Sequence, residues 1–220
     1  MADTGHQRAL IVVDVQNEYV TGKLVIEYPP LATSLANIAK AMDAASNHNV
    51  QVVVATQVLD QDAPVFADGT DGANLHQSIA IKPCSQLFVR NHARLFCEPT
   101  LVTWLQANSI ETVTVVGYIA QTLIDIAICD AIRVGFKVEF LSDAGGSVPC
   151  RNRAGTASAE EIHRVLSVVL HSSSTAVLLT DEWIQMLDDG MCAERDNILN
   201  SHRRALLIRA QRISAETPER

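Results

Sequence analysis

The chain has 220 residues, of which 48% are hydrophobic and 19% are charged, a composition typical of globular proteins with one good-sized core. The net charge of −8 argues against nucleic acid as a partner, and strand-sized apolar runs argue against a membrane partner. The amino terminus has no secretory signal pattern, and the five cysteines include no C-x-x-C pair. We therefore expect reduced thiols and a cytoplasmic protein.

Strand-like apolar runs alternate with helical patterns along most of the chain. We predict six strands, at residues 9–14, 50–57, 86–90, 113–116, 136–141 and 176–179. We predict helices at residues 31–48 and 99–107, from about 121 onward, at 157–171, and from 180 onward. This alternation predicts a six-stranded parallel sheet in a three-layer α/β/α sandwich of the Rossmann-like kind. No linker interrupts it, so we predict one domain over residues 1–189.

Two segments depart from this alternation. Residues 58–80 are irregular and acidic, and a loop of this length in a compact domain is usually functional. Residues 190–220 form a charged helical extension, whose stretch 193–210 carries one apolar stripe. The stripe consists of Ile198, Leu199, His202, Leu206 and Leu207. This pattern is typical of a surface or inter-subunit helix, and we expect a homodimer or a higher homo-oligomer.

The sequence predicts a ligand-binding or active site within the stretch 113–130. Its β-branched run reads as a buried strand, Gly117 breaks that strand, and helical spacing begins at about Gln121. Parallel sheets place ligands at such turns, beside the first amides of the following helix. Asp14 would stand at the same edge, at the end of the first strand. A buried acid is costly unless it is paired or catalytic, although a strand-end Asp that caps the next turn is common.

Three stretches, taken in order and spacing, resemble the isochorismatase-like hydrolases, also called the cysteine hydrolase superfamily. They are 10–17 (Leu-Ile-Val-Val-Asp-Val-Gln-Asn), 89–101, and 115–125 with Asp130, Gly135 and 142–144 following. The resemblance spans roughly residues 8–185 and implies the fold derived above. It also implies a catalytic triad of Asp, Lys and Cys. Asp14 matches the Asp, whereas Arg90 stands at the Lys position and Leu123 at the Cys position.

These departures change the chemistry that the resemblance implies. Leu123 has no nucleophilic atom, and Arg90 stays protonated, so it cannot shuttle a proton but can bind a carboxylate. Cys129 is six residues along the same helix on another face, which excludes it as a replacement. Cys97 and Cys150 lie on segments that could approach the site, but buried cysteines more often act as small hydrophobes.

Isochorismatases within this family cleave a vinyl ether without the thiol and use the Asp as general acid. The strand end at Gln57 and the turn Ile119-Ala120-Gln121 resemble that branch. Substrate-binding positions implied by the resemblance are Gln57, Phe96, Tyr118, Ile119 and Ala120. The bulky Leu123 and the Arg90 replacement speak against this reading, so the alternative of a catalytically inactive binding or scaffold protein stays open.

Four further expectations follow from the resemblance. A small molecule is the expected partner, with no cofactor and no metal, because Asp60 and Asp62 are not followed by a histidine until His76. Asp14, Gln57, Arg90, Ala120 and Leu123 should converge at the carboxyl ends of the first four strands. An apolar environment beside Leu123 should raise the pKa of Asp14, whereas a nearby Arg90 should oppose the shift and keep Asp14 ionised. The family's non-proline cis peptide bond is expected between Ile119 and Ala120.

Overall fold

The computed structural model describes residues 8–216, and the side chains of residues 8–209. Its centre is a six-stranded parallel sheet with the strand order β3-β2-β1-β4-β5-β8. The strands are β1 (Arg8–Val13), β2 (Gln51–Gln57), β3 (Gln86–Arg90), β4 (Thr112–Tyr118), β5 (Lys137–Gly146) and β8 (Thr175–Leu178). The predicted parallel sheet is thus confirmed, and the alternation of strands with helices is what required it.

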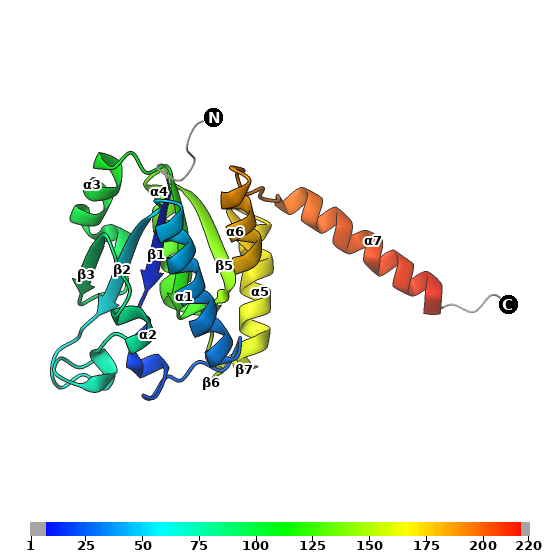
Figure 1. The fold of residues 1–220 in the computed structure, drawn as a ribbon. Helices are drawn as coiled ribbons and strands as arrows, with labels where there is room; N and C mark the ends of the chain where they lie inside the picture. Colours follow the sequence, from blue (N-terminus) through cyan, green and yellow to red (C-terminus); the bar gives the residue numbers. More distant parts are fainter. Residues whose placement is uncertain (1–7, 217–220) are drawn as a thin grey trace.

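Helices cover both faces of the sheet, as Figure 1 shows. They are α1 (Leu31–Asn47), α2 (Gln77–Ala80), α3 (Pro99–Ala107), α4 (Asp125–Arg133), α5 (Ala159–His171) and α6 (Thr180–Asp188). α1 and α6 contact each other on one face, whereas α4 and α5 pack from the other. This distribution follows from the strand order, because right-handed crossovers place their helices on opposite faces once the direction of winding reverses.

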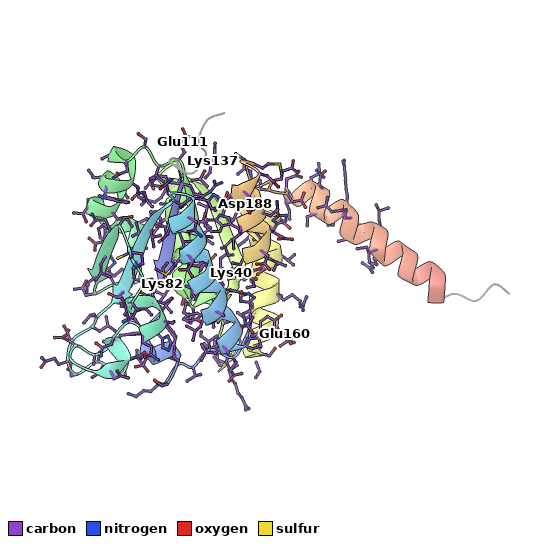
Figure 2. The ribbon with its side chains drawn as sticks, viewed as in Figure 1. Lys40, Lys82, Glu111, Lys137, Glu160 and Asp188 are labelled. Carbon is purple, nitrogen blue, oxygen red and sulfur yellow. The ribbon has the colours of Figure 1, made fainter. Side chains whose placement is uncertain are left out.

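The core consists of the central strands and the inner faces of these helices. All six residues of β1 are buried, which agrees with its continuous apolar run between two neighbouring strands. Charged side chains such as Lys40, Glu160 and Asp188 lie on the outside of the helix layers (Figure 2). Within residues 8–216, no helix combines the length and apolar composition needed to cross a membrane.

The local assignments differ from the sequence prediction in three places. An antiparallel hairpin, β6 (Cys150–Asn152) and β7 (Gly155–Ala157), was not predicted, because its strands have only three residues each. The long loop contains the 3-10 turn η2 (Asp71–Ala73) and α2. The carboxyl-terminal helix, α7 (Ile198–Glu216), begins and ends later than the predicted stretch 193–210 and extends away from the sheet (Figure 1).

Candidate active site

Asp14 lies at the point where the strand order of the sheet reverses. The chain passes from β1 to β2 on one side of β1 and later forms β4 on the other side of β1. It follows β1 directly, has a φ of 49°, and donates its backbone N–H to the carbonyl of Ala55 at 2.9 Å. On the other side, Gly117 of β4 pairs with Val13. A Cβ at Gly117 would lie 2.0 Å from the Val13 carbonyl oxygen, so only glycine allows this close approach of the two strands.

Arg90 and Asp14 form an ion pair inside the protein. Arg90 ends β3 and Gln57 ends β2, and these two residues are partners in the strand register. Nη2 of Arg90 donates to Oδ2 of Asp14 at 2.6 Å, and both side chains have 0% exposure. Nη1 of Arg90 lies 3.5 Å from Oε1 of Gln57. The parallel register thus brings together three side chains that the sequence placed at three separate strand ends.

The ion pair leaves hydrogen-bonding capacity unused. Among the described residues, neither Oδ1 of Asp14 nor Nε of Arg90 has a hydrogen-bond partner. Burial raises the pKa of Asp14 to about 6, and the charge and hydrogen bond of Arg90 act in the opposite direction. Both opposing effects were expected from the sequence, and burial is the larger of the two. A carboxyl group with this pKa can both donate and accept a proton near neutral pH.

Gln16 fixes the strand end that carries Gln57. Its Nε2 donates to the carbonyl of Gln57 at 2.8 Å and to the carbonyl of Ala73 at 2.6 Å. Its Oε1 accepts from the backbone N–H of Gln57 at 2.9 Å. One buried side chain therefore joins the segment after β1, the end of β2 and the turn η2. Sequence reasoning quoted Gln16 as part of the Asp14 motif but did not assign this positioning role.

An aromatic cluster lies beside the ion pair, and two of its three rings, those of Tyr19 and Phe66, were not predicted from the sequence. The ring of Tyr19 is 5.1 Å from the ring of Phe66 and 5.8 Å from that of Tyr118. Burial and then the charge of Asp14 raise the pKa of Tyr19 far above its usual value, so Tyr19 stays a neutral phenol. Spacing could not have revealed the cluster, because its three rings come from distant segments.

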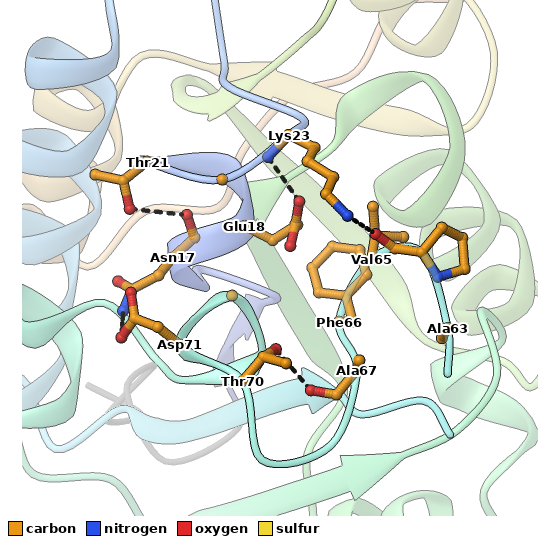
Figure 3. Close-up of a pocket in the computed structure, with 13 residues that line it drawn as sticks. Asn17, Glu18, Thr21, Lys23, Ala63, Val65, Phe66, Ala67, Thr70 and Asp71 are labelled. Carbon is orange, nitrogen blue, oxygen red and sulfur yellow. Dashed lines mark hydrogen bonds between the residues drawn. The ribbon is translucent and has the colours of Figure 1, made fainter. Parts of the chain in front are cut away.

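A cavity of about 360 Å³ lies on the outer side of this cluster (Figure 3). Asn17, Glu18, Lys23, Phe66 and Asp71 are among its lining residues, whereas Asp14 and Arg90 are not. Phe66 is buried, with a φ of 53°, and its ring lines the cavity on one side and packs on Tyr19 on the other. Rings therefore separate the cavity from the region of the ion pair.

The turn after β4 holds the remaining predicted positions. Ile119, Ala120 and Leu123 are all buried, and Ala120 begins the wide helical turn η4 (Ala120–Ile124). Leu123 fills the predicted nucleophile position with an aliphatic side chain. Tyr118 is buried, and its hydroxyl is 2.8 Å from Oγ of Ser34 on α1. The non-proline cis bond lies between Tyr118 and Ile119. The prediction of a cis bond between Ile119 and Ala120 was thus wrong by one bond.

The structure does not bring Phe96 to the group around Asp14. Its ring packs 6.1 Å from that of Phe136, which directly precedes β5 at the opposite edge of the sheet. The cause is the segment after β3, which turns back along α4. Arg94 anchors that segment by two hydrogen bonds to the carboxylate of Asp130, at 3.1 Å and 2.5 Å. The implied substrate-binding position of Phe96 therefore disagrees with the geometry.

Neither the cysteines nor His76 contributes a side chain to this site. All five cysteines are free and exposed. Cys97 donates to Asp130 and Cys150 to the carbonyl of Val148, so neither is bonded to the ion pair. Nδ1 of His76 is 2.8 Å from Oγ of Ser78. Within residues 8–216, no three His, Cys, Asp or Glu side chains are grouped so as to hold a metal ion.

Comparison with known proteins places these features in a family. Residues 8–174 match the isochorismatase domain family. A crystal structure of a candidate isochorismatase from Burkholderia xenovorans LB400 superposes with a TM-score of 0.91 and 48% identity, covering 93% of this chain and 98% of the other.

Two more distant relatives are similar over most of their length. The uncharacterised isochorismatase family protein YddQ of Bacillus subtilis is 23% identical over 80% of this chain and 98% of its own. The secreted isochorismatase effector Isc1 of Verticillium dahliae is 24% identical over 78% of this chain and 88% of its own.

Proposed function

Because the chain belongs to the isochorismatase family of hydrolases, we propose that it cleaves a small carboxylate-bearing vinyl ether without a thiol nucleophile. In this proposal Asp14 is the general acid and base, and Arg90 binds the substrate carboxylate. Leu123 leaves no atom for covalent catalysis, so the reaction proceeds by proton transfer and attack of water.

The incomplete bonding of the buried ion pair carries the proposal. Oδ1 of Asp14 and Nε of Arg90 are buried without partners among the described residues, and such groups are costly in a native structure. A substrate carboxylate on Arg90 would satisfy the guanidinium in bidentate fashion. It would also weaken the hold of Arg90 on Asp14, and the pKa of Asp14 would rise further, so that its protonated form would be favoured.

The proposed reaction is balanced with one water molecule. Asp14 donates its proton to the terminal carbon of the vinyl ether, and the ether oxygen stabilises the resulting cation. Water adds to the cationic carbon and returns a proton to Asp14. The hemiketal then breaks its bond to the leaving alkoxide, which takes the remaining hydroxyl proton, to give a ketone and an alcohol.

The reaction requires an opening to Asp14. The side chains of Asp14 and Arg90 are completely buried, and the cavity that Phe66 lines does not include them. We propose that movement of Phe66 away from Tyr19 joins this cavity to the ion pair. The position of Phe66 on a long loop, beyond the regular elements, supports this role.

Two observations favour a second candidate, a binding protein without catalysis. Asp14 and Arg90 have 0% exposure, and Leu123 occupies the position of the family nucleophile. In that case the same pocket would bind a small carboxylate without turnover. Under either candidate we expect a small-molecule ligand, no cofactor, and a cytoplasmic location, which the free cysteines support.

The test is a turnover screen with isochorismate, simpler enol ethers and amides. Asp14→Asn should lower turnover of the enol ether by at least about 100-fold, as expected for loss of a general acid. The control Asp62→Asn, on the exposed loop, should leave it unchanged. Wild-type kcat/KM should fall as pH rises above about 6, because the free enzyme must hold the proton on Asp14. Carboxylate binding without turnover would instead establish the second candidate.

Two variants extend the test. Leu123→Ala should leave turnover intact or raise it, and Phe66→Ala should raise the rate of substrate binding. The double variant Leu123→Cys with Arg90→Lys restores the family triad. Amide hydrolysis that appears only in this double variant would show that the native chain lacks thiol chemistry. Thiol-sensitive amide hydrolysis by the native chain would contradict the assignment of Leu123.

A further inference from the structure

The helix α7 extends away from the domain that carries the site. Its 19 residues span about 28 Å at the usual helical rise. Near its start, Oγ of Ser172, which follows α5, donates to Oγ of Ser201 at 2.8 Å. Beyond that point the helix runs away from α5 and α6 (Figure 1). In folded proteins, most of the stability of a helix comes from the packing of one face against a neighbour.

The described part of α7 exposes several aliphatic side chains. Five aliphatic side chains are about half exposed or more, namely Ile198, Leu199, Leu206, Leu207 and Ile208. Leu199 and Leu206 are seven residues apart and lie on one face. Such an exposed stripe indicates an interaction surface.

The crystal structure from Burkholderia contains a matching segment. Its alignment covers 93% of this chain, which is about 205 of the 220 residues. Only 197 residues precede α7, so the aligned region must include part of α7.

The outer face of α5 is opposite to α7 in net charge. α7 contains four arginines and one glutamate, a net charge of +3, whereas α5 contains two glutamates and one arginine, a net charge of −1. On α5, Val165, Val168 and Val169 are each more than half exposed. The exposed valines and the net negative charge of α5 therefore match the exposed aliphatic side chains and the arginines of α7.

We propose that α7 is an exchanged arm, and that in a homodimer α7 of each copy packs on the outer face of α5 of the other copy. The direction of α7 away from its own α5 leaves that face uncovered in one chain. A two-fold axis would cover both faces at once, because each copy supplies one arm and one receptor face. This inference does not depend on the proposed chemistry.

The experiment measures self-association of the full chain by sedimentation velocity over a concentration series. The wild type should form a dimer. The arm variant, Leu199→Asp with Leu206→Asp, and the receptor variant, Val165→Asp with Val168→Asp, should each raise the dissociation constant at least about 100-fold, because each change occurs twice in the dimer. The control Ile81→Asp, at another exposed aliphatic residue, should leave it unchanged.

Mixing the two variants gives the sharper result. A mixed pair keeps one intact contact, between the arm of the receptor variant and the α5 face of the arm variant. The mixture should therefore associate more tightly than either variant alone. As a second arm variant, Arg203→Glu with Arg209→Glu keeps the apolar stripe and should weaken the dimer, most strongly at low salt. Circular dichroism checks that each variant is folded.

Three results would overturn the proposal. A wild type that stays monomeric would show that α7 does not pack on a second copy of the chain. A receptor variant that remains dimeric while the arm variant dissociates would place α7 on another surface. Mixed variants that do not associate would exclude reciprocal exchange.

Discussion

Two buried arginine–carboxylate pairs lie at opposite edges of the sheet and differ in how completely they are bonded. Toward the amino ends of the strands, Arg8 donates two hydrogen bonds to Glu139, at 2.8 Å and 3.1 Å. Thr114 and Trp183 donate to the same carboxylate at 2.7 Å and 3.1 Å. At the carboxyl ends, Arg90 and Asp14 share one close contact and leave an atom of each without a partner among the described residues.

The difference separates a structural pair from a candidate functional pair. A fully bonded network in the interior rigidifies the core and tolerates little change. An incompletely bonded pair contributes less to stability, but it can accept a ligand group without breaking an existing network. The four predictions below test this contrast through changes in stability.

The largest effect is expected at the fully bonded pair. Glu139→Gln should lower the free energy of unfolding by about 3–5 kcal/mol, because it leaves Arg8 charged and buried and turns an amide nitrogen toward donors. Urea denaturation measures the change. The control is Glu111→Gln, at an exposed residue 3.7 Å from Lys137 near the same edge (Figure 2). A loss below about 1 kcal/mol would show that the network is not structural.

The second-largest effect is expected in the pH dependence of the free energy of unfolding, to which the titration of Asp14 contributes. Its pKa in the folded chain, about 6, is above the usual 3.8, so the folded state holds the proton more tightly than the unfolded state does. The stability from this group is therefore fully present below about pH 4 and is lost as pH rises through about 6. Between about pH 4 and about pH 6, the free energy of unfolding of the wild type should fall by roughly 2–3 kcal/mol relative to that of Asp14→Asn.

Denaturation of the wild type and of Asp14→Asn at a series of pH values gives this difference directly. Other titrating groups are common to both chains, so their contributions cancel in the comparison. Parallel stability curves would mean that Asp14 does not have a raised pKa in the folded chain.

A smaller effect is expected when both charges of the candidate site are removed. Asp14→Leu with Arg90→Met should leave the stability unchanged or raise it by about 1–2 kcal/mol, because the desolvation cost of both ions disappears. Thermal unfolding at neutral pH measures this, and turnover should be absent. A large loss of stability would place this pair in the same structural class as Arg8 and Glu139.

The smallest effect is expected at an exposed ion pair. Lys40 and Asp181 link α1 to α6, with side chains that are 52% and 77% exposed. Lys40→Ala should change the free energy of unfolding by less than about 1 kcal/mol, because water and salt already screen this pair. Urea denaturation at low and high salt checks it. A change as large as that at Glu139 would show that burial does not explain the contrast.

Much of the candidate site could be placed from the sequence, because it depends on strand ends. Asp14, Gln57 and Arg90 each follow or end an apolar run, and parallel strands bring such ends to one edge. The sequence could not reveal Tyr19, Phe66 or the bonding of Gln16, since these contacts join segments that carry no common spacing. It also misplaced Phe96, because the ion pair of Arg94 and Asp130 that redirects its segment is long-range.

The sequence by itself determined the layered parallel sheet and the absence of a nucleophile at Leu123. Apolar periodicity and residue chemistry are local properties, and a leucine has no reactive atom in any fold. Only the tertiary structure decided that Asp14 and Arg90 are completely enclosed, that two of their atoms have no hydrogen-bond partner among the described residues, and that the cavity lined by Phe66 does not include them. Burial and access depend on how distant segments pack over a strand end, and no local pattern encodes that packing.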